Sequence, residues 1–185
     1  VQDINSSIEV KQRILEDSAL ISNIEKLAEK CVECYQNKNK VILAGNGGSA
    51  ADAQHIAAEF VSRFELDRPG LPSIALNTDT SMITAIGNDF GYEKIFTRQL
   101  DANGNKGDVF IGISTSGNSK NIIDAVKFAK ENGIFTVGFS GDSGKLNELS
   151  DLSIAVPSKR TARIQEAHIM IGHILCGIVE SRLFQ

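Results

Sequence analysis

The sequence predicts an α/β fold, a three-layer sandwich in which helices cover both faces of a parallel sheet, preceded by a helical N-terminal extension. Two observations lead to this prediction. The first glycine is Gly45 and the first proline is Pro69, so the start of the chain holds neither of the residues that most disfavour helix. Beyond residue 40, short continuous apolar runs alternate with stretches of helical periodicity. Continuous runs are typical of strands buried on both faces of a parallel sheet.

The predicted elements follow in order along the chain. Residues 4–36 repeat apolar side chains at helical spacing and divide near Asp17 and Ser18, because Asp and Ser favour helix caps. Five apolar runs then predict strands, at residues 41–44, 73–76, 109–113, 135–139 and 152–156. Helices are expected around them, at residues 49–63, 79–88, 92–101, 119–132, 144–149 and 161–183. Right-handed crossovers join such strands into one sheet. We therefore expect a single domain over residues 1–185, with an extension (1–38) and an α/β body (39–185).

Charge and composition argue against several classes of protein. The chain carries 19 basic and 23 acidic residues, a formal net charge of −4, whereas a nucleic-acid-binding protein needs a basic face. No apolar run approaches the ~20 residues that span a bilayer, and no basic-then-apolar signal segment begins the chain. The three cysteines, an odd number, offer no disulfide framework and suit a reducing compartment. We expect a cytoplasmic protein that binds neither nucleic acid nor membrane.

One predicted strand ends in a loop rich in hydroxyl groups. The third apolar run leads into Ser114, Thr115, Ser116 and Ser119, immediately before a predicted helix. Hydroxyls, the unpaired amides of a helix start and the positive end of the helix dipole together form a cradle for phosphate. The alternative is a loop in which Ser119 is a plain N-cap, but a cap needs only one hydroxyl. No Gly-Lys-Ser/Thr sequence follows, so nucleotide hydrolysis is not expected.

The first predicted strand ends in a turn suited to a sugar. Asn46, Gly47 and Gly48 follow this strand. Glycine lets a ligand approach the backbone, and the Asn46 amide offers a donor and an acceptor to sugar hydroxyls. Tight strand-to-helix turns without a ligand use the same residues, so both interpretations are open on this evidence alone.

Two helices carry side chains capable of acid–base or metal-binding chemistry. His55 and Glu59 are four residues apart and share one side of a helix. Such a pair is consistent with metal ligands, an acid–base pair or a solvated ion pair. In the last helix, Gln165, His168 and His173 interrupt an apolar sequence, where an unpaired buried polar group costs about 1–3 kcal/mol. We expect His168 to be a buried histidine bonded to a backbone carbonyl.

Four sequence blocks carry a resemblance to a known family. They are Gly45-Asn46-Gly47-Gly48-Ser49, Gly87-Asn88-Asp89-Phe90-Gly91, Gly112-Ile113-Ser114-Thr115-Ser116-Gly117-Asn118-Ser119 and Arg163-Ile164-Gln165-Glu166. Over essentially its whole length the chain resembles the bacterial sedoheptulose 7-phosphate isomerases, or phosphoheptose isomerases, of the sugar-isomerase (SIS) fold. The resemblance implies a five-stranded parallel sheet of flavodoxin-like type and a homotetramer with active sites at subunit interfaces.

The resemblance also implies a reaction and the groups that perform it. Sedoheptulose 7-phosphate would be converted to D-glycero-D-manno-heptose 7-phosphate by proton transfer through an enediol(ate), a step in the synthesis of heptose precursors. By resemblance Glu59 is the base and His173 the acid. The family's zinc ion, one per subunit, would be held by His55, Glu59, Gln165 and His173.

The same resemblance, together with the two loops, gives a set of substrate contacts. They are Asn46, Gly47 and Gly48 at the sugar, Asn88 and Asp89 at hydroxyls, Ser114, Thr115, Ser116 and Ser119 at the phosphate, and Glu59, Arg63 and Gln165 elsewhere on the substrate. An exposed arginine without a ligand is the alternative for Arg63. Gln165 and His173 lie eight residues apart, which is about 12 Å along a helix and roughly 80° around it. Zinc ligands from two subunits, or a set of three ligands, therefore remain open.

Two other functions are compatible with the resemblance. The same fold holds a scaffold protein that binds the replication initiator, to which Ala75-Leu76-Asn77-Thr78-Asp79 and Pro157-Ser158-x-Arg160 are similar. The second alternative is an isomerase of another phosphosugar. The scaffold has lost members of the catalytic set, so the presence of His55, Glu59, Gln165 and His173 here favours an enzyme.

Overall fold

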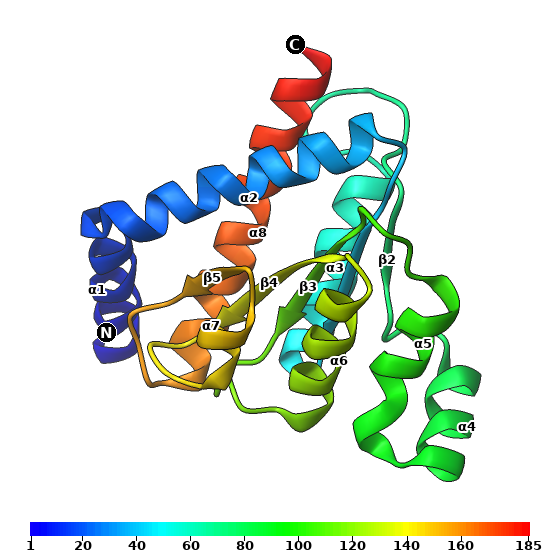
Figure 1. Cartoon of the computed structure of the whole chain (residues 1–185). Helices are drawn as coiled ribbons and strands as arrows, with labels where there is room; N and C mark the ends of the chain where they lie inside the picture. The colour runs from blue at the N-terminus through cyan, green and yellow to red at the C-terminus, as the bar shows by residue number, and fades with distance from the viewer.

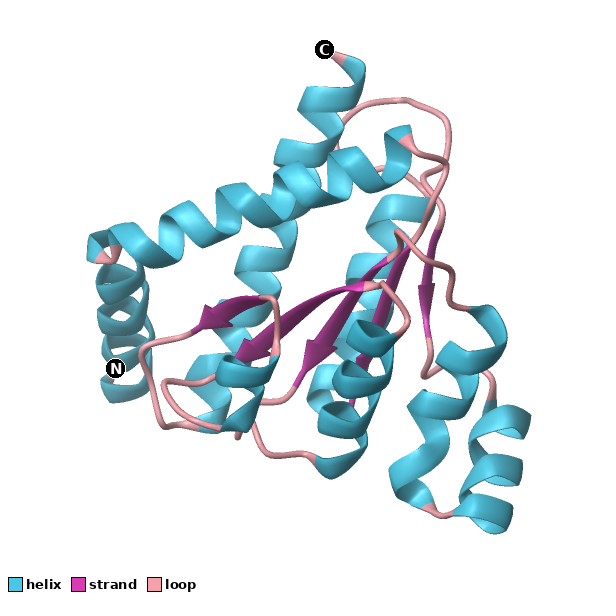
Figure 2. Cartoon of the chain, in the orientation of Figure 1, coloured by secondary structure: helices cyan, strands magenta, loops and turns pink.

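The computed structural model describes all of residues 1–185, and its centre is a five-stranded sheet in which every strand is parallel (Figure 1, Figure 2). The strands lie in the order β2-β1-β3-β4-β5. Their bounds are Val41–Gly45 (β1), Ser73–Ala75 (β2), Val109–Ile113 (β3), Phe135–Ser140 (β4) and Leu152–Ala155 (β5). The predicted α/β fold with a five-stranded parallel sheet is confirmed.

Helices cover both faces of this sheet and also precede it (Figure 2). Their bounds are Gln2–Glu16 (α1), Ser18–Gln36 (α2), Gly48–Val61 (α3), Thr80–Phe90 (α4), Ile95–Asn103 (α5), Lys120–Glu131 (α6), Lys145–Leu149 (α7) and Thr161–Phe184 (α8), with a 3-10 turn at Tyr92–Lys94 (η1). The break between α1 and α2 falls where the sequence predicts it, because the Asp17 carboxylate accepts a hydrogen bond from the Leu20 amide at 2.9 Å.

Alternate strand residues face two separate apolar cores, as the pleat of a strand requires. Val41 and Leu43 point into the larger core, which α1, α2, α3 and α8 complete. Ile42 and Ala44 point into a smaller core completed by α5, α6 and α7. The two helices of the N-terminal extension therefore belong to the main core, and α2 lies across α8 in Figure 1.

Strand order places the site of interest. The chain leaves β1 for β2 on one side and returns to β3 on the other side of β1. The carboxyl ends of β1 and β3 therefore flank a topological switch point, which is where open parallel sheets bind ligands. Asn46 and Ser114 are the first residues after these two strands.

The helix α8 is long and apolar enough to meet a test for membrane-spanning helices, although the sequence contains no uninterrupted apolar run of that length. Averaged over 18 residues, α8 is apolar enough to cross a membrane by length and composition, although its sequence contains polar residues such as Gln165 and His173. In this structure 44% of that stretch is buried inside the protein. A core helix passes the same test of composition, and α8 contributes residues such as Ile171 and Leu175 to the larger core.

Candidate active site

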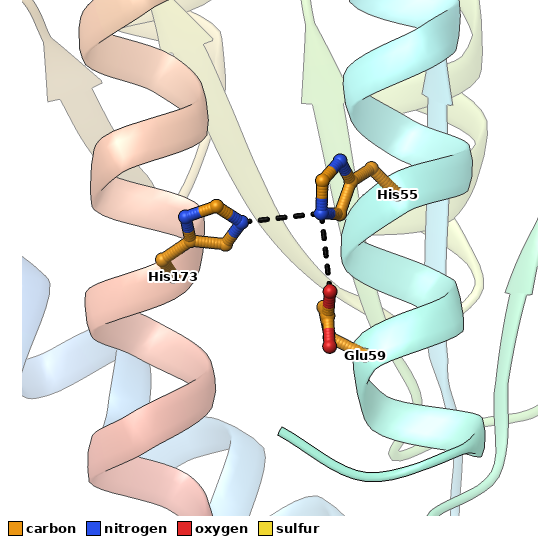
Figure 3. A group of neighbouring side chains, drawn as sticks. All are labelled: His55, Glu59 and His173. Carbon is orange, nitrogen blue, oxygen red and sulfur yellow. Dashed lines mark hydrogen bonds and ion pairs between the residues drawn. The ribbon is translucent and has the colours of Figure 1, made fainter. Parts of the chain in front are cut away.

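His55, Glu59 and His173 form a cluster at the seam between α3 and α8 (Figure 3). The His55 Nε2 atom lies 3.1 Å from Glu59 Oε1 and 3.2 Å from His173 Nε2. All three ligand atoms lie within 4.8 Å of one another. The side chain of His55 is 49% exposed and that of Glu59 is 25% exposed. The cluster is therefore partly open to solvent and accessible to a small molecule.

Close packing of α3 against α8 brings these side chains together. Gly48 near the start of α3 lies against Gln165 near the start of α8, and Ile56 farther along α3 lies against Gly172 farther along α8. The two helices therefore run in the same direction. A Cβ atom on Gly172 would lie 2.6 Å from Ile56 Cδ1, well inside contact distance. Glycine at this point lets the helices approach closely enough for the neighbouring residues, His55 and His173, to touch.

Aromatic contacts fix the orientation of the two imidazoles. The rings of His55 and His173 meet edge to face, with centroids 5.0 Å apart. On its other side the His173 ring packs against Phe64, with centroids 5.6 Å apart. Such ring pairs stabilise a defined side-chain orientation in addition to the area they bury.

The donor set fits a zinc ion. Two imidazole nitrogens and one carboxylate oxygen are the protein ligands of a catalytic zinc site, in which a fourth position stays open. Zinc bonds of about 2.0–2.1 Å in a tetrahedron place neighbouring ligand atoms about 3.3 Å apart. The separations of 3.1 and 3.2 Å around His55 Nε2 are close to that spacing.

In the single chain, the side chain of Gln165 is too far from His55, Glu59 and His173 to join their cluster. Its side chain packs against Gly48 at the start of α3, where a Cβ atom would lie 2.5 Å from Gln165 Nε2. This is about 12 Å along α8 from His173. The position of Gln165 beside the glycine turn fits the predicted substrate contact better than a metal ligand shared with His173 of the same chain.

The predicted sugar-binding turn is held by a network of amides. Asn46 and Asn121 exchange two side-chain hydrogen bonds of 2.9 Å each. Tyr92 donates from its hydroxyl to Asn46 Oδ1, also at 2.9 Å. Gly47 has φ of 56°, a conformation that favours glycine, and it directly precedes α3. The sequence analysis assigned no role to Asn121 or Tyr92, which only the folded chain brings to Asn46.

The hydroxyl-rich loop has the features of an anion site. Ser114 donates to Ser119 Oγ at 2.8 Å and accepts from the Ser119 amide at 3.4 Å, and Ser116 Oγ accepts from the amide of Asn118. Ser119 precedes α6, yet its side chain makes no capping hydrogen bond, so the plain N-cap is not what the loop forms. The Ile122 amide donates to Asn121 Oδ1 at 3.0 Å, which leaves the amides of Lys120 and Asn121, the first two residues of α6, available to a ligand.

The remaining predicted substrate residues are exposed. Asn88 and Asp89 lie in the last turn of α4, where Asn88 Nδ2 donates to Asp89 Oδ1 at 2.8 Å. Arg63 lies two residues beyond the end of α3 and is exposed, whereas Thr115 is half-buried beside Ser114. None of these side chains forms a hydrogen bond or ion pair with His55, Glu59 or His173.

Two further titratable side chains lie on the same helices. His168 is buried and lies 3.0 Å from the Ser140 carbonyl oxygen. Burial lowers its pKa to about 4, so it is a neutral core histidine as expected.

Asp52 lies one turn before His55 and has a buried oxygen without a hydrogen-bond partner. Burial raises the Asp52 pKa to about 6, although His55 lowers it in part. Asp52 was not among the predicted site residues, although its spacing of three residues before His55 places it on the same side of α3.

The fold and this site define a class of protein, an α/β protein of the open parallel type with an anion loop and an acid–base or metal-ligating cluster. Comparison with known proteins refines that class. The SIS domain family model matches residues 4–141. The phosphoheptose isomerase of Aneurinibacillus thermoaerophilus is 64% identical over 183 residues, which cover 98% of this chain and 92% of that protein.

Solved structures agree with this comparison. The phosphoheptose isomerase of Neisseria gonorrhoeae has a TM-score of 0.91 at 43% identity, covering 97% of this chain and 96% of that one. The enzyme of Francisella tularensis has a TM-score of 0.93 at 38% identity, covering 97% and 95%. The chain belongs to the phosphoheptose isomerase family of SIS-domain proteins.

Proposed function

We propose that the chain converts sedoheptulose 7-phosphate to D-glycero-D-manno-heptose 7-phosphate and so supplies heptose precursors. The observation that carries this proposal is the cluster of His55, Glu59 and His173, in a chain 64% identical to a phosphoheptose isomerase. An aldose–ketose isomerisation needs a base at carbon and an acid at oxygen, and the cluster offers a carboxylate beside two imidazoles.

The proton transfers balance with these residues alone. Glu59 takes a proton from C1 of the ketose and returns it at C2. His173 gives a proton to the carbonyl oxygen on C2 and then takes the proton that the hydroxyl on C1 loses as the new carbonyl forms, so both residues end in their starting states. A carboxylate is ionised near neutral pH and an imidazole can carry a proton there. The sum is an isomerisation that consumes no oxidant or reductant.

The substrate phosphate would bind in the loop of Ser114, Thr115, Ser116 and Ser119. Asn46, Gly47 and Gly48 would face the sugar, with Gln165 beside them and with Asn88, Asp89 and Arg63 contributing polar contacts. The amides of Lys120 and Asn121 at the start of α6 and the hydroxyls of the loop support this assignment. A dianionic phosphate is stabilised by such donors and by the helix dipole.

Zinc is the proposed cofactor, held by His55, Glu59 and His173. When bound, it would polarise the substrate carbonyl and stabilise the enediolate. Only Oε1 of Glu59 faces His55, so the second carboxylate oxygen is free to accept the substrate proton. The Nε2 atom of His173 cannot bind zinc and donate a proton at once. Loss of activity on chelation would assign polarisation of the carbonyl to zinc and leave His173 as a ligand, whereas activity that survives chelation would assign the proton to His173.

We further propose a cytoplasmic homotetramer whose active sites lie at subunit interfaces. His55 lies seven residues into α3 from Gly48, about 10 Å along the helix from the sugar turn. Two apolar residues close to the cluster in sequence, Val61 after Glu59 and Ile174 after His173, are exposed. A second subunit covering this seam would close the site. Light scattering on the purified chain tests the tetramer.

The deciding experiment is the Glu59→Gln variant assayed with sedoheptulose 7-phosphate. Loss of the base is expected to lower turnover about 10²–10⁴-fold, while the protein folds and still binds the sugar phosphate. Undiminished turnover would contradict the mechanism. A panel of pentose, hexose and amino-sugar phosphates tests the alternative of another substrate. Binding of a replication initiator by a chain inactive with zinc supplied would support the scaffold instead.

A further inference from the structure

A buried carboxylate on α8 lies near the cluster without belonging to it. Glu180 is seven residues beyond His173, about two helical turns, so both side chains leave the same side of α8. The Glu180 side chain is 2% exposed. Its oxygens accept hydrogen bonds from the amides of Phe64, Glu65 and Leu66, at 3.0, 2.8 and 2.9 Å. A charge this deeply buried is stable only when it is fully paired.

Arg68 pairs with this carboxylate and connects it to Glu59. Arg68 Nε donates to Glu180 Oε1 at 2.8 Å, and its side chain is also 2% exposed. The other nitrogens of the guanidinium donate to the main-chain carbonyls of Phe60 and Glu59, at 2.8 and 3.0 Å. Carbonyls in the last turn of a helix lack a partner within the helix. Arg68 therefore supplies that partner at the residue that carries the proposed base, and ties this end of α3 to α8.

The loop organised by Glu180 also reaches His173. The three amide donors belong to consecutive residues just beyond α3. The first of them is Phe64, whose ring packs on the imidazole of His173. One carboxylate thus fixes the backbone that carries Glu59 and the ring that lies against His173.

We propose that Glu180 is a positioning residue for the cluster of His55, Glu59 and His173, acting through Arg68 and Phe64 while touching neither substrate nor metal. The buried pair sets how far the end of α3 stands from α8, and with it the separation of the proposed base and acid. The inference rests on the proposed function for the identity of the reaction. The geometry of the cluster is independent of that identity.

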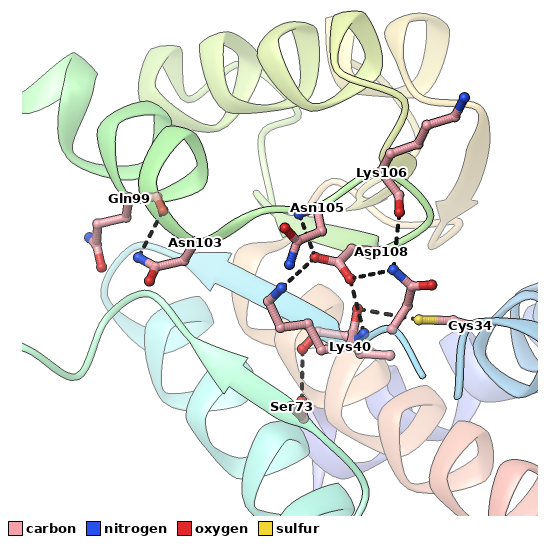
Figure 4. Close-up of polar contacts among 10 residues, drawn as sticks. Cys34, Lys40, Ser73, Gln99, Asn103, Asn105, Lys106 and Asp108 are labelled. Atoms are coloured by element: carbon pink, nitrogen blue, oxygen red, sulfur yellow. Dashed lines mark hydrogen bonds and ion pairs between the residues drawn. The ribbon is translucent and has the colours of Figure 1, made fainter. Parts of the chain in front are cut away.

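A second buried ion pair provides a matched control (Figure 4). The carboxylate of Asp108 is fully buried and accepts a hydrogen bond from Lys40 Nζ at 2.7 Å. It also accepts from the amides of Lys40 and Asn105. This pair precedes β1 and β3 and makes no contact with α3 or α8 through its hydrogen bonds. Removing either carboxylate charge leaves a cation without its partner, buried Arg68 in one case and half-buried Lys40 in the other, so both changes reduce stability.

The test compares Glu180→Gln and Asp108→Asn with the unaltered chain, at a temperature where circular dichroism shows all three folded. Zinc affinity of the metal-free proteins is measured by competition with a chromophoric chelator. Steady-state kcat and KM are measured with sedoheptulose 7-phosphate. Glu180→Gln is expected to lower both zinc affinity and kcat about 10–100-fold, with KM changed less than about threefold. Asp108→Asn is expected to leave all three values near those of the unaltered chain.

Arg68→Lys is the second variant, because lysine keeps the charge beside Glu180 but loses the fork that reaches Phe60 and Glu59. Arg68→Lys is expected to lower zinc affinity and kcat as Glu180→Gln does, with a smaller effect on stability. If Glu180→Gln does not fold, Arg68→Lys tests the positioning role in its place. Unchanged zinc affinity and kcat in the folded variants, or equal losses in Asp108→Asn, overturn the positioning role. If the unaltered chain has no isomerase activity, the proposed function fails, and the zinc affinities still test the role of Glu180.

Discussion

Substituting Gly172 by alanine tests whether close helix packing sets the geometry of the cluster. The added Cβ atom would lie 2.6 Å from Ile56 Cδ1 and 2.7 Å from Ile56 Cγ1. Carbon atoms in contact lie about 3.5–4.0 Å apart, so either the end of the Ile56 side chain shifts or α3 and α8 separate by about 1 Å. Ile56 is fully buried, so its side chain can shift only against other core residues, and helix separation is the expected outcome. The residues that follow Gly172 and precede Ile56 are His173 and His55, so the separation falls on the cluster.

Gly172→Ala is expected to lower stability only slightly and turnover strongly. Overpacking a core costs about 1–3 kcal/mol, whereas alanine in place of glycine within a helix gains up to about 1 kcal/mol. We expect the free energy of unfolding to fall by about 0–2 kcal/mol. A displacement of about 1 Å between catalytic groups lowers turnover about 10²-fold. Activity is therefore expected to fall far more than stability.

The control is Gly177→Ala on the same helix. There the added Cβ atom would lie 3.4 Å from Phe64 Cε1, which is ordinary contact, so stability is expected to hold or rise and turnover to persist. Urea unfolding followed by circular dichroism gives stability, and conversion of sedoheptulose 7-phosphate gives turnover. If Gly172→Ala is as stable and as active as Gly177→Ala, the reasoning about helix spacing is wrong.

Three further predictions concern the phosphate loop, the metal and the acid sensitivity of the fold. Ser119→Ala removes a hydroxyl bonded to Ser114 and is expected to raise KM about tenfold with little change in kcat. An unchanged KM in steady-state kinetics would exclude Ser119 from the phosphate site. Chelation is expected to abolish activity and added zinc to restore it, whereas full turnover in protein shown by mass spectrometry to be metal-free would refute the zinc site. Burial raises the Glu180 pKa, but its hydrogen bonds from Phe64, Glu65, Leu66 and Arg68 outweigh burial and lower it from 4.5 to about 2. Because the folded pKa is the lower one, this carboxylate stabilises the fold above pH 4.5 and loses that contribution as pH falls toward 2, by up to about 1.4 kcal/mol per pH unit. Glu180→Gln should flatten this part of the curve in acid-dependent urea unfolding, and an unchanged slope would show that Glu180 does not cause it.

Much of the fold could be predicted because its strands are buried on both faces. Runs such as 109–113 are continuously apolar, so they stand out from the helical periodicity around them. Helix boundaries depend on finer signals. The predicted helix at 79–88 continues to Phe90, and it stops there because Gly91 has φ of 90°, which sequence periodicity does not report.

The site residues that are close in sequence could be predicted, whereas those that only the folded chain brings together could not. His55 and Glu59 were identified because four residues make one helical turn. Arg68 and Glu180 carry no such signal, because Glu180 is a single charge near a chain end and its partners are mostly main-chain amides 112 to 116 residues away. The distance of Gln165 from His173 follows from helix rise alone, but its contact with Gly48 depends on how α3 and α8 are aligned.

The contact between His55 and His173 joins residues 118 positions apart, and α8 is the last element of the chain. During synthesis, β1 and α3 leave the ribosome long before α8 does, so a nascent chain displays His55 and Glu59 without their third partner. Contacts of such long sequence separation form late in folding. A nascent chain that has not yet released α8 therefore has no assembled cluster to hold the proposed zinc ion.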